Sequence, residues 1–246
     1  MTGLKAILNW GVESGRLKEN VADRVRVRVP AKQQNREQGL TDAEARAILS
    51  AAQTYQRADR KNAQTTDSVF TAAAKRWVPW LCAFTGARVA EVTQLRKDDV
   101  CLDEEIPFIR ITPDAGSVKT GKYRDVPVHP QLIDLKFGEF VAAAPDGPPF
   151  FDGRRAREGR QHPSKHVAQR LAVWIRSLKV IADEVDPNHC WRHRMKTIAR
   201  DLELDMRTVD AIQGHAPRTA GERYGDVSLA AKYKVMKQLP HYEMNV

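Results

Sequence analysis

Cysteine is scarce in this sequence, and its spacing excludes two classes of protein. The chain of 246 residues contains three cysteines, Cys82, Cys101 and Cys190, and none of them belongs to a C-x-x-C pair. An odd number of widely separated cysteines argues against a disulfide framework and against a structural zinc site. Cys82 lies within an apolar run of helical spacing, so we expect it in the hydrophobic core.

Long apolar runs are also lacking. Met1 is not followed by a basic stretch and a long apolar run, which is the pattern of a secretory signal peptide. No apolar segment approaches the roughly 20 residues that a membrane-spanning helix requires. The sequence therefore predicts a cytoplasmic protein that has no membrane partner.

Positive charge, in contrast, is abundant. The chain carries 40 Lys and Arg against 31 Asp and Glu, which gives a formal net charge of +9. The basic residues recur from Arg24 through Lys237 rather than in one tail, so the folded surface itself is expected to be basic. Such a surface suits a protein that binds the phosphates of nucleic acid, and it also suits a protein that is charged only for solubility.

Residues 1–39 differ in pattern from the rest of the chain. Residues 3–14 have the spacing of a short amphipathic helix. Residues 20–30 alternate valine with charged residues, and residues 32–39 are polar and typical of a linker. About thirty residues are too few to bury a core of their own. We therefore expect this stretch to be part of a separate domain.

Helix caps and turn signals organise the remainder. Thr41 and Glu44 form a capping box, Asp205 is a helix cap, and Gly86 and Gly214 are stop signals. The expected helices cover about residues 41–53, 69–85, 89–95, 132–141, 167–181, 187–202 and 206–213. The expected strands cover residues 108–112 and 124–128, and the expected loops cover residues 55–66 and 144–163, the second of them basic. The sum is a mainly α fold with one small antiparallel β-sheet.

A set of polar residues stands out within this framework because each lies in a distinctive local frame. The set is Arg88, Lys119, His189, Arg192, His215 and Tyr224. Arg88 lies in the run TGARVAEV, and Lys119 is followed by Thr-Gly and then by Arg-x-Val-Pro. His189 and Arg192 form an H-x-x-R pair, His215 follows a glycine, and Tyr224 comes nine residues later.

In this order and in these frames the set resembles the tyrosine recombinases, the phage-integrase-like enzymes that cut and rejoin DNA. The resemblance covers about residue 40 to the end of the chain. It implies a tyrosine recombinase catalytic-domain fold over residues 40–246, a linker over 31–39, and a remnant of an N-terminal helical core-binding domain over 1–30. Most of that N-terminal domain is then missing, and we expect a fragment made by engineering or by truncation of the gene.

The resemblance implies a role for each residue of the set. Arg88 and Arg192 clamp the phosphate, and such forked, permanently charged donors suit a phosphoryl group. Lys119 protonates the leaving 5′ oxygen, His189 accepts the proton of the nucleophile Tyr224, and His215 donates a hydrogen bond to the phosphate. Neither a metal nor ATP nor another cofactor is needed.

Several alternatives remain open from the residues alone. Lys122 is a rival to Lys119, and either lysine is compatible with an ordinary phosphate contact. His189 and His193 have the spacing of two zinc ligands, although no third ligand with suitable spacing is evident. His215 is also placed to interact with the dipole of the preceding helix.

Glu91, one helical turn after Arg88, is either a surface residue or a residue that orients Arg88 or another site residue. Tyr233 and Tyr242 are the other tyrosines of the tail, but only Tyr224 has the family's distance from His215.

The function that the resemblance implies is site-specific recombination through a 3′-phosphotyrosyl intermediate. The expected partners are double-stranded DNA and other protomers, in a tetramer that exchanges C-terminal segments such as Leu229–Leu239. One alternative is a tyrosine-type topoisomerase, which shares the chemistry. The other is a non-enzymatic regulator, because the stretch Trp191–Gln213 is also typical of a helix-turn-helix. The residues around H-x-x-R and after Gly-His depart from the family's usual form, which leaves substrate details open.

Overall fold

A reciprocal cap opens the first helix of the main body. The computed structural model describes residues 2–26, 35–57, 67–156, 160–216, 219 and 224–244. The Thr41 side chain accepts a hydrogen bond from the backbone N–H of Glu44, and the Glu44 carboxylate accepts one from the N–H of Thr41. The predicted capping box is therefore confirmed, and it satisfies two N–H groups that the helix leaves without partners.

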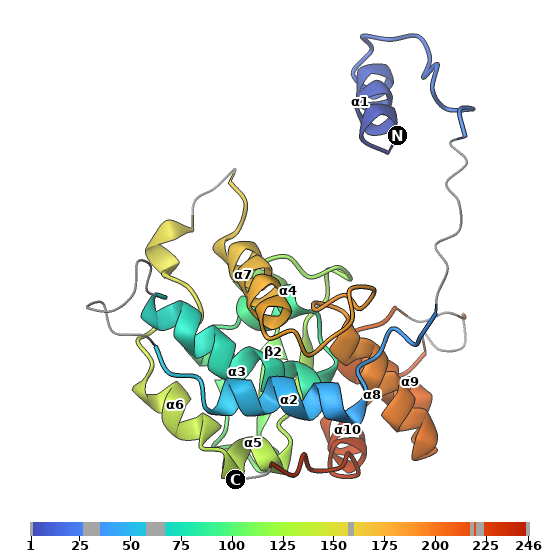
Figure 1. Ribbon diagram of the computed structural model, residues 1–246. Helices are drawn as coiled ribbons and strands as arrows, with labels where there is room; N and C mark the ends of the chain where they lie inside the picture. Colours follow the sequence, from blue (N-terminus) through green and yellow to red (C-terminus); the bar gives the residue numbers. More distant parts are fainter. Residues whose placement is uncertain are drawn as a thin grey trace. The chain divides into compact units, whose positions relative to one another are not determined.

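The helices of the described residues are as follows. They are α1 (Thr2–Glu13), α2 (Asp42–Gln53), α3 (Val69–Thr85), α4 (Val89–Thr93), α5 (Pro130–Asp134), α6 (Phe137–Ala143), α7 (Pro163–Ser177), α8 (Cys190–Asp201), α9 (Met206–Gln213) and α10 (Leu229–Met236), shown in Figure 1. Short 3₁₀ turns cover Lys97–Asp99, Pro113–Ala115 and Gly153–Arg155.

The chain divides into two units, Met1–Arg36 and Glu37–Val246. The first unit contains α1, on which Leu4, Ile7 and Trp10 are each more than half exposed. The second unit contains every other helix and strand named here. The assignment of residues 1–30 to a remnant of another domain stays a prediction, and residues 31–34 of the predicted linker lie outside the described part.

A small antiparallel sheet lies within the second unit. Its strands are β1 (Val100–Cys101), β2 (Phe108–Ile111) and β3 (Arg124–Pro127), in the order β1-β2-β3. The predicted hairpin of β2 and β3 is confirmed. The sequence did not predict β1, because two residues are too few to show the alternation by which a strand is recognised.

Three of the predicted helices have wrong boundaries. The helix expected over 132–141 is split into α5 and α6, because Lys136 adopts a left-handed conformation with φ 69°. The helix expected from residue 167 begins instead at Pro163, where the preceding His162 caps it and proline suits the first turn. It ends at Ser177, short of the expected residue 181.

The third of these helices is α8, for which Asp186 was the expected cap. Asp186 instead accepts hydrogen bonds within a turn, from the N–H of Asn188 to its carboxylate and from the N–H of His189 to its carbonyl. The helix begins at Cys190, with His189 at the cap position. His189 is consequently the N-cap residue of α8 and does not lie inside its first turn.

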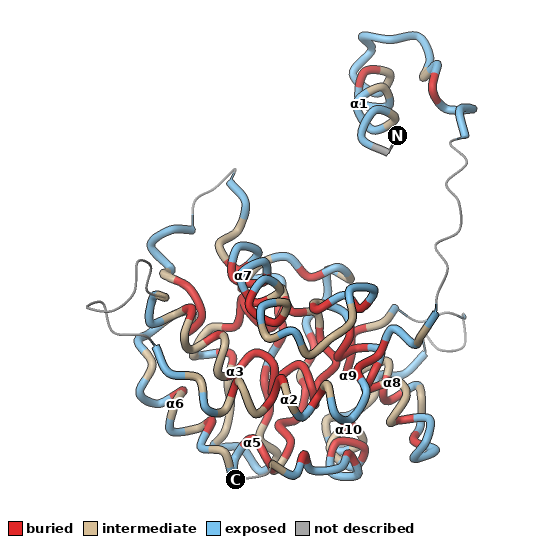
Figure 2. Tube along the Cα trace, in the orientation of Figure 1, coloured by how far each residue is buried: buried red, intermediate tan, exposed pale blue. Residues whose placement is uncertain are grey.

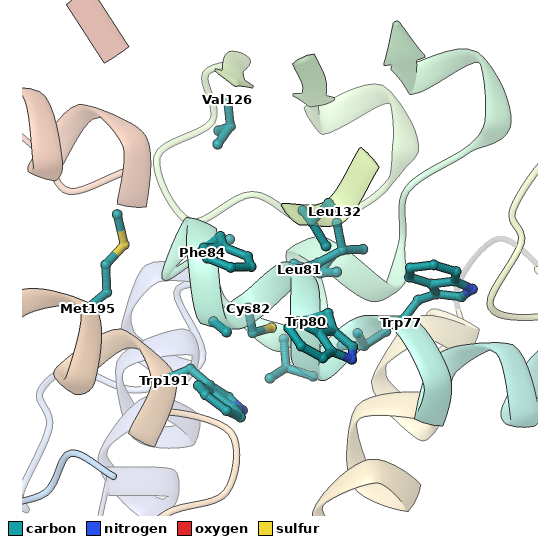
Figure 3. Packing of buried hydrophobic residues seen from close by; sticks show 14 of the residues in the cluster. Trp77, Trp80, Leu81, Cys82, Phe84, Val126, Leu132, Trp191 and Met195 are labelled. Atoms are coloured by element: carbon teal, nitrogen blue, oxygen red, sulfur yellow. The ribbon is translucent and has the colours of Figure 1, made fainter. Parts of the chain in front are cut away.

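The core lies around α3, which packs against α2, α7 and α8. Trp80, Leu81 and Phe84 of α3 are fully buried, and Trp191 and Met195 face them from α8 (Figure 3). Buried segments run through α2, α3 and α8 in Figure 2. The prediction that Cys82 lies in the core is confirmed. Leu202, at the end of the helix expected over 187–202, is 44% exposed.

Among the described residues, no helix combines the length and the apolar character that a membrane span requires.

His129 joins the core to the C-terminal tail as a neutral side chain. Its ring stacks on Phe84 with centroids 3.8 Å apart, and its Nδ1 accepts from the N–H of Gln131, the helix-capping bond of α5. Its Nε2 must then carry the proton and donate to the carbonyl of Leu239 at 3.1 Å. Burial lowers the pKa of His129 from 6.5 to about 4.

The low pKa of His129 predicts a pH-dependent stability. Because the folded pKa lies below the unfolded value, the stabilisation is complete above about pH 6.5 and is lost as the pH falls toward 4. We expect His129 to account for a decrease of roughly 3 kcal/mol in the free energy of unfolding over that range. Urea denaturation of the parent and of His129→Gln, each at several pH values, measures the difference. Parallel pH profiles of the two proteins would contradict the assignment.

Candidate active site

A cleft of about 1280 Å³ opens between the β2–β3 connection and the segment that runs from α9 to α10. Arg88, Lys119 and His215 line it, from three separate parts of the chain. Lys122, the rival of Lys119, lines it as well. Both lysines are exposed in the connection between the strands, so the structure does not decide between them.

A buried carboxylate lies behind the cleft. Glu91 is 1% exposed, and its two oxygens accept hydrogen bonds from Arg88 Nη1 at 2.8 Å and from Arg124 Nη2 at 2.6 Å. Burial alone would raise the pKa of Glu91, but the charges and hydrogen bonds of the two arginines outweigh it, so the pKa lies below its ordinary value. Glu91 is therefore ionised and orients Arg88. Of the two alternatives that the sequence left open for Glu91, a surface residue and an orienting residue, the structure favours the second.

Arg124 connects the sheet to the end of α9. Its Nε donates to the carbonyl of Ile212 at 3.1 Å, and its Nη2 also donates to the carbonyl of Gln213 at 3.2 Å. Gly214 follows with φ 72°, and a Cβ at that position would lie 2.5 Å from Arg124 Cζ. Glycine is therefore required here both by the backbone conformation and by the guanidinium packed against it.

Arg192 is held from α8 by two backbone carbonyls. Its Nη1 donates to Gly86 at 2.8 Å and to Gln213 at 2.7 Å, and its Nε donates to His215 Nε2 at 3.1 Å. Burial, followed by the nearby charge of Arg88, lowers the pKa of Arg192 to about 10. It is still a cation at neutral pH, and it is fixed in one orientation.

Two donors of this centre have no partner among the described residues. They are Arg192 Nη2 and Arg124 Nη1, both buried. An unpartnered buried donor on a charged group is costly, and such groups usually face a ligand or ordered water. A set of fixed guanidinium donors beside an open cleft is suited to an anion with several oxygens, such as a phosphate.

The ring of His215 is polarised by the carboxylate of Asp210. Because the Arg192 nitrogen only donates, His215 Nε2 is the acceptor, and Nδ1 carries the proton that it donates to Asp210 at 2.5 Å. Asp210 also accepts from Lys196. Burial lowers the pKa of His215 despite the opposing effect of Asp210, so the ring is neutral near pH 7. Donation from Nε2 to a phosphate then requires both a proton on Nε2 and the release of the Arg192 bond.

The structure does not bring the whole predicted set together. His189 is 55% exposed, its Nδ1 pairs with Asp186 Oδ2 at 3.0 Å, and it does not line the cleft. Tyr224 is 80% exposed, and its side chain does not line the cleft either, although the next residue, Gly225, does. Arg88, Arg192 and His215 meet in one charged centre, and Lys119 lines the same cleft as Arg88 and His215. Tyr224 precedes a cleft residue in the chain, and His189 lies outside the cleft lining.

Two residues of the centre were not predicted. Arg124 stands in the Arg-x-Val-Pro frame that was used only to align Lys119, and a buried charge within a strand is a signal for a role of its own. Asp210 gives no comparable signal, because only the fold brings it to His215 and Lys196. Among the described residues, no group of three or more His, Cys, Asp or Glu side chains is arranged to hold a metal ion.

Comparison with curated proteins finds recombinases. The tyrosine recombinase XerC of Rhodospirillum centenum is 30% identical over 205 residues, which cover 77% of this chain and 56% of the relative. The tyrosine recombinase XerC of Mesorhizobium japonicum is 25% identical over 232 residues, which cover 94% and 67%. The chain thus spans a little over half the length of the first relative. No protein-family model matches it.

Comparison with solved structures agrees. An integrase from mycobacterium phage Brujita superposes with a TM-score of 0.56 at 18% identity, over 99% of this chain and 71% of the integrase. The XerH site-specific recombinase, solved as a pre-cleavage complex with its difH substrate, gives a TM-score of 0.53 at 18% identity, over 95% and 61%. At these identities the likeness shows a shared fold, and the predicted mainly α fold with a small antiparallel sheet is confirmed.

Proposed function

Because the chain belongs to the tyrosine recombinase family, we propose that residues 40–246 are the catalytic domain of an enzyme that cuts and rejoins double-stranded DNA at specific sites. The observation that carries the proposal is the charged centre beside the cleft, in which Arg192 and Arg124 each present a buried N–H donor that has no acceptor among the described residues. A phosphodiester supplies acceptors of the right charge and geometry for these donors.

The proposed reaction begins with the attack of the Tyr224 oxygen on a DNA phosphorus atom. The phenolic proton passes to His189, and the bond from phosphorus to the 5′ oxygen breaks. Lys119 gives a proton to that oxygen, which leaves a 3′-phosphotyrosyl bond and a free 5′ hydroxyl. The 5′ hydroxyl of another strand reverses the step, so the energy of the phosphodiester is conserved and ATP is not consumed.

Arg88 and Arg192 stabilise the charge that develops on the phosphorane oxygens. Their value depends on being fixed before the reaction, because a preorganised donor does not have to reorganise as the charge forms. Glu91 provides this for Arg88, and the carbonyls of Gly86 and Gln213 provide it for Arg192. His215 adds a further donor once its Nε2 carries a proton.

The partners follow from the same proposal. The XerH relative was solved with a DNA substrate, and a basic chain with a cleft of this charge fits DNA. Assembly into a tetramer on two DNA sites belongs to the proposal as well. In this structure the candidate exchange segment packs within its own chain, since α10 contacts α9 and β3.

Two other functions would use parts of the same site. A tyrosine-type topoisomerase would use the same residues, and strand exchange between two sites separates the two reactions. A helix-turn-helix regulator would rest on α8 and α9, but it gives no reason for the buried pairing of Glu91 with Arg88 and Arg124 far outside those helices.

Tyr224→Phe tests the nucleophile directly. The change removes one hydroxyl from an exposed side chain, so folding and DNA binding should be unchanged while covalent attachment is lost. The assay uses a pool of nicked duplexes with randomised sequence. After cleavage the short fragment diffuses away, so the strand cannot be rejoined and the covalent adduct persists. The adduct is then detected on a denaturing gel. Tyr233→Phe is the matched control and should form the adduct at the parental rate. An adduct that persists in Tyr224→Phe would contradict the assignment.

Lys119→Ala tests the general acid and decides between the two lysines. Loss of the acid should slow cleavage by roughly a hundredfold or more, while Lys122→Ala should have a much smaller effect. A duplex with a bridging 5′ sulfur has a leaving group that needs no proton, so Lys119→Ala should cleave it at nearly the parental rate. If sulfur rescues Lys122→Ala instead, the acid is Lys122; if it rescues neither variant, both lysines act only by binding phosphate.

A further inference from the structure

An arginine of α9 holds the described part of the segment that carries Tyr224. Arg207, in the first turn of α9, donates from Nη2 to the backbone carbonyl of Tyr224 at 2.7 Å and to that of Gly225 at 2.8 Å. Charge-assisted bonds to two successive carbonyls fix the backbone at this point. The Tyr224 side chain, in contrast, is 80% exposed.

The two carbonyls lie at the rim of the cleft. Gly225 and the two residues after it line the cleft, as Lys119 does. Gly225 has φ 76°, a left-handed conformation that turns the chain directly after the tyrosine. The Arg207 bonds therefore hold the nucleophile's backbone at the edge of the phosphate site while its side chain stays free to rotate.

The far end of the same segment is also anchored. Lys232 of α10 is 9% exposed, and its Nζ donates to the backbone carbonyl of Asp125 in β3 at 3.0 Å. Burial lowers the pKa of Lys232. Residues 226–231 thus run between an anchor on α9 and an anchor on β3. Arg124 connects the same two elements, because it lies in β3 and donates to the carbonyl of Ile212 in α9.

We propose that Arg207 is a positioning residue for the nucleophile: through the carbonyls of Tyr224 and Gly225 it holds the tyrosine-bearing segment beside the phosphate centre. This inference rests on the proposed function, because it needs Tyr224 to be the nucleophile. Arg207 itself does not line the cleft, and the two bonds described here go to the tyrosine-bearing segment rather than to the charged centre. Its effect passes through the position of Tyr224.

The first measurement is the rate of covalent adduct formation on the nicked duplexes. Arg207→Ala should slow it by about tenfold to a hundredfold, because a small misplacement of a reacting group costs factors of this size. DNA binding should change no more than in Arg200→Ala, which removes an exposed arginine of equal charge from α8. Arg207→Lys, which keeps a donor on a long side chain, should recover part of the rate.

The second measurement separates positioning from damage to the phosphate centre. In Tyr224→Phe, hydrogen peroxide is supplied as an external nucleophile: its anion attacks phosphorus, the bond to the 5′ oxygen breaks, and that oxygen takes up a proton. This cleavage needs the phosphate centre but not the tyrosine-bearing segment. Adding Arg207→Ala to Tyr224→Phe should leave the peroxide rate unchanged.

The outcomes are distinct. A slower adduct rate with an unchanged peroxide rate supports the inference. An adduct rate in Arg207→Ala equal to that of the parent would overturn it, and so would an equal loss in both reactions, which would make Arg207 part of the phosphate centre or of the DNA contact. If the parent itself forms no adduct, the proposed function fails, and the inference fails with it for that separate reason.

Discussion

The charged centre depends on one buried carboxylate. Glu91 accepts from Arg88 on one side and from Arg124 on the other, and without it three arginines would repel one another beside the cleft. Like charges at short range in a partly buried site cost several kcal/mol, whereas a buried carboxylate between two of them offsets much of that cost. One negative charge therefore allows three fixed positive charges to lie close together beside one cleft, and the net positive charge that remains attracts an anion.

The fold supports this arrangement by ending two helices at the centre. Gly86 ends α3 and Gly214 ends α9, each in a left-handed conformation. Both ends leave carbonyl groups without helical partners, and Arg192 and Arg124 use several of them as acceptors. A Cβ at Gly86 would collide with the side chains of Gln213 and Met195. The glycines that terminate the helices thus also leave room for neighbouring side chains, Gly86 for Gln213 and Met195 and Gly214 for Arg124.

Local signals were enough to predict much of this from the sequence. The capping box at Thr41, the cap at Asp205 and the two glycine stops act over a few residues, and the structure confirms them. The split at Lys136 was not predictable, because it requires a left-handed non-glycine residue that no local preference indicates. The start of α8 was misplaced because Asp186 satisfies a turn just as readily as a helix. For the site, the order of the polar residues indicated the family. The contacts of Arg124 were not predictable, because they join residues that are 33 to 89 positions apart. The bond between Asp210 and His215 was not predictable either, because it depends on how the chain folds at the end of α9.

The central claim is that the Glu91–Arg124 pair holds the charged centre together, and a double-mutant cycle tests it most directly. The free energy of unfolding is measured in urea for the parent, Glu91→Gln, Arg124→Gln and the double variant. Each single change should cost about 3 to 5 kcal/mol, because it leaves one buried charge without its partner. The double variant should cost clearly less than the sum, with a coupling energy of about 2 kcal/mol or more. Costs that simply add would contradict the account, because the pair would then contribute nothing beyond its separate members.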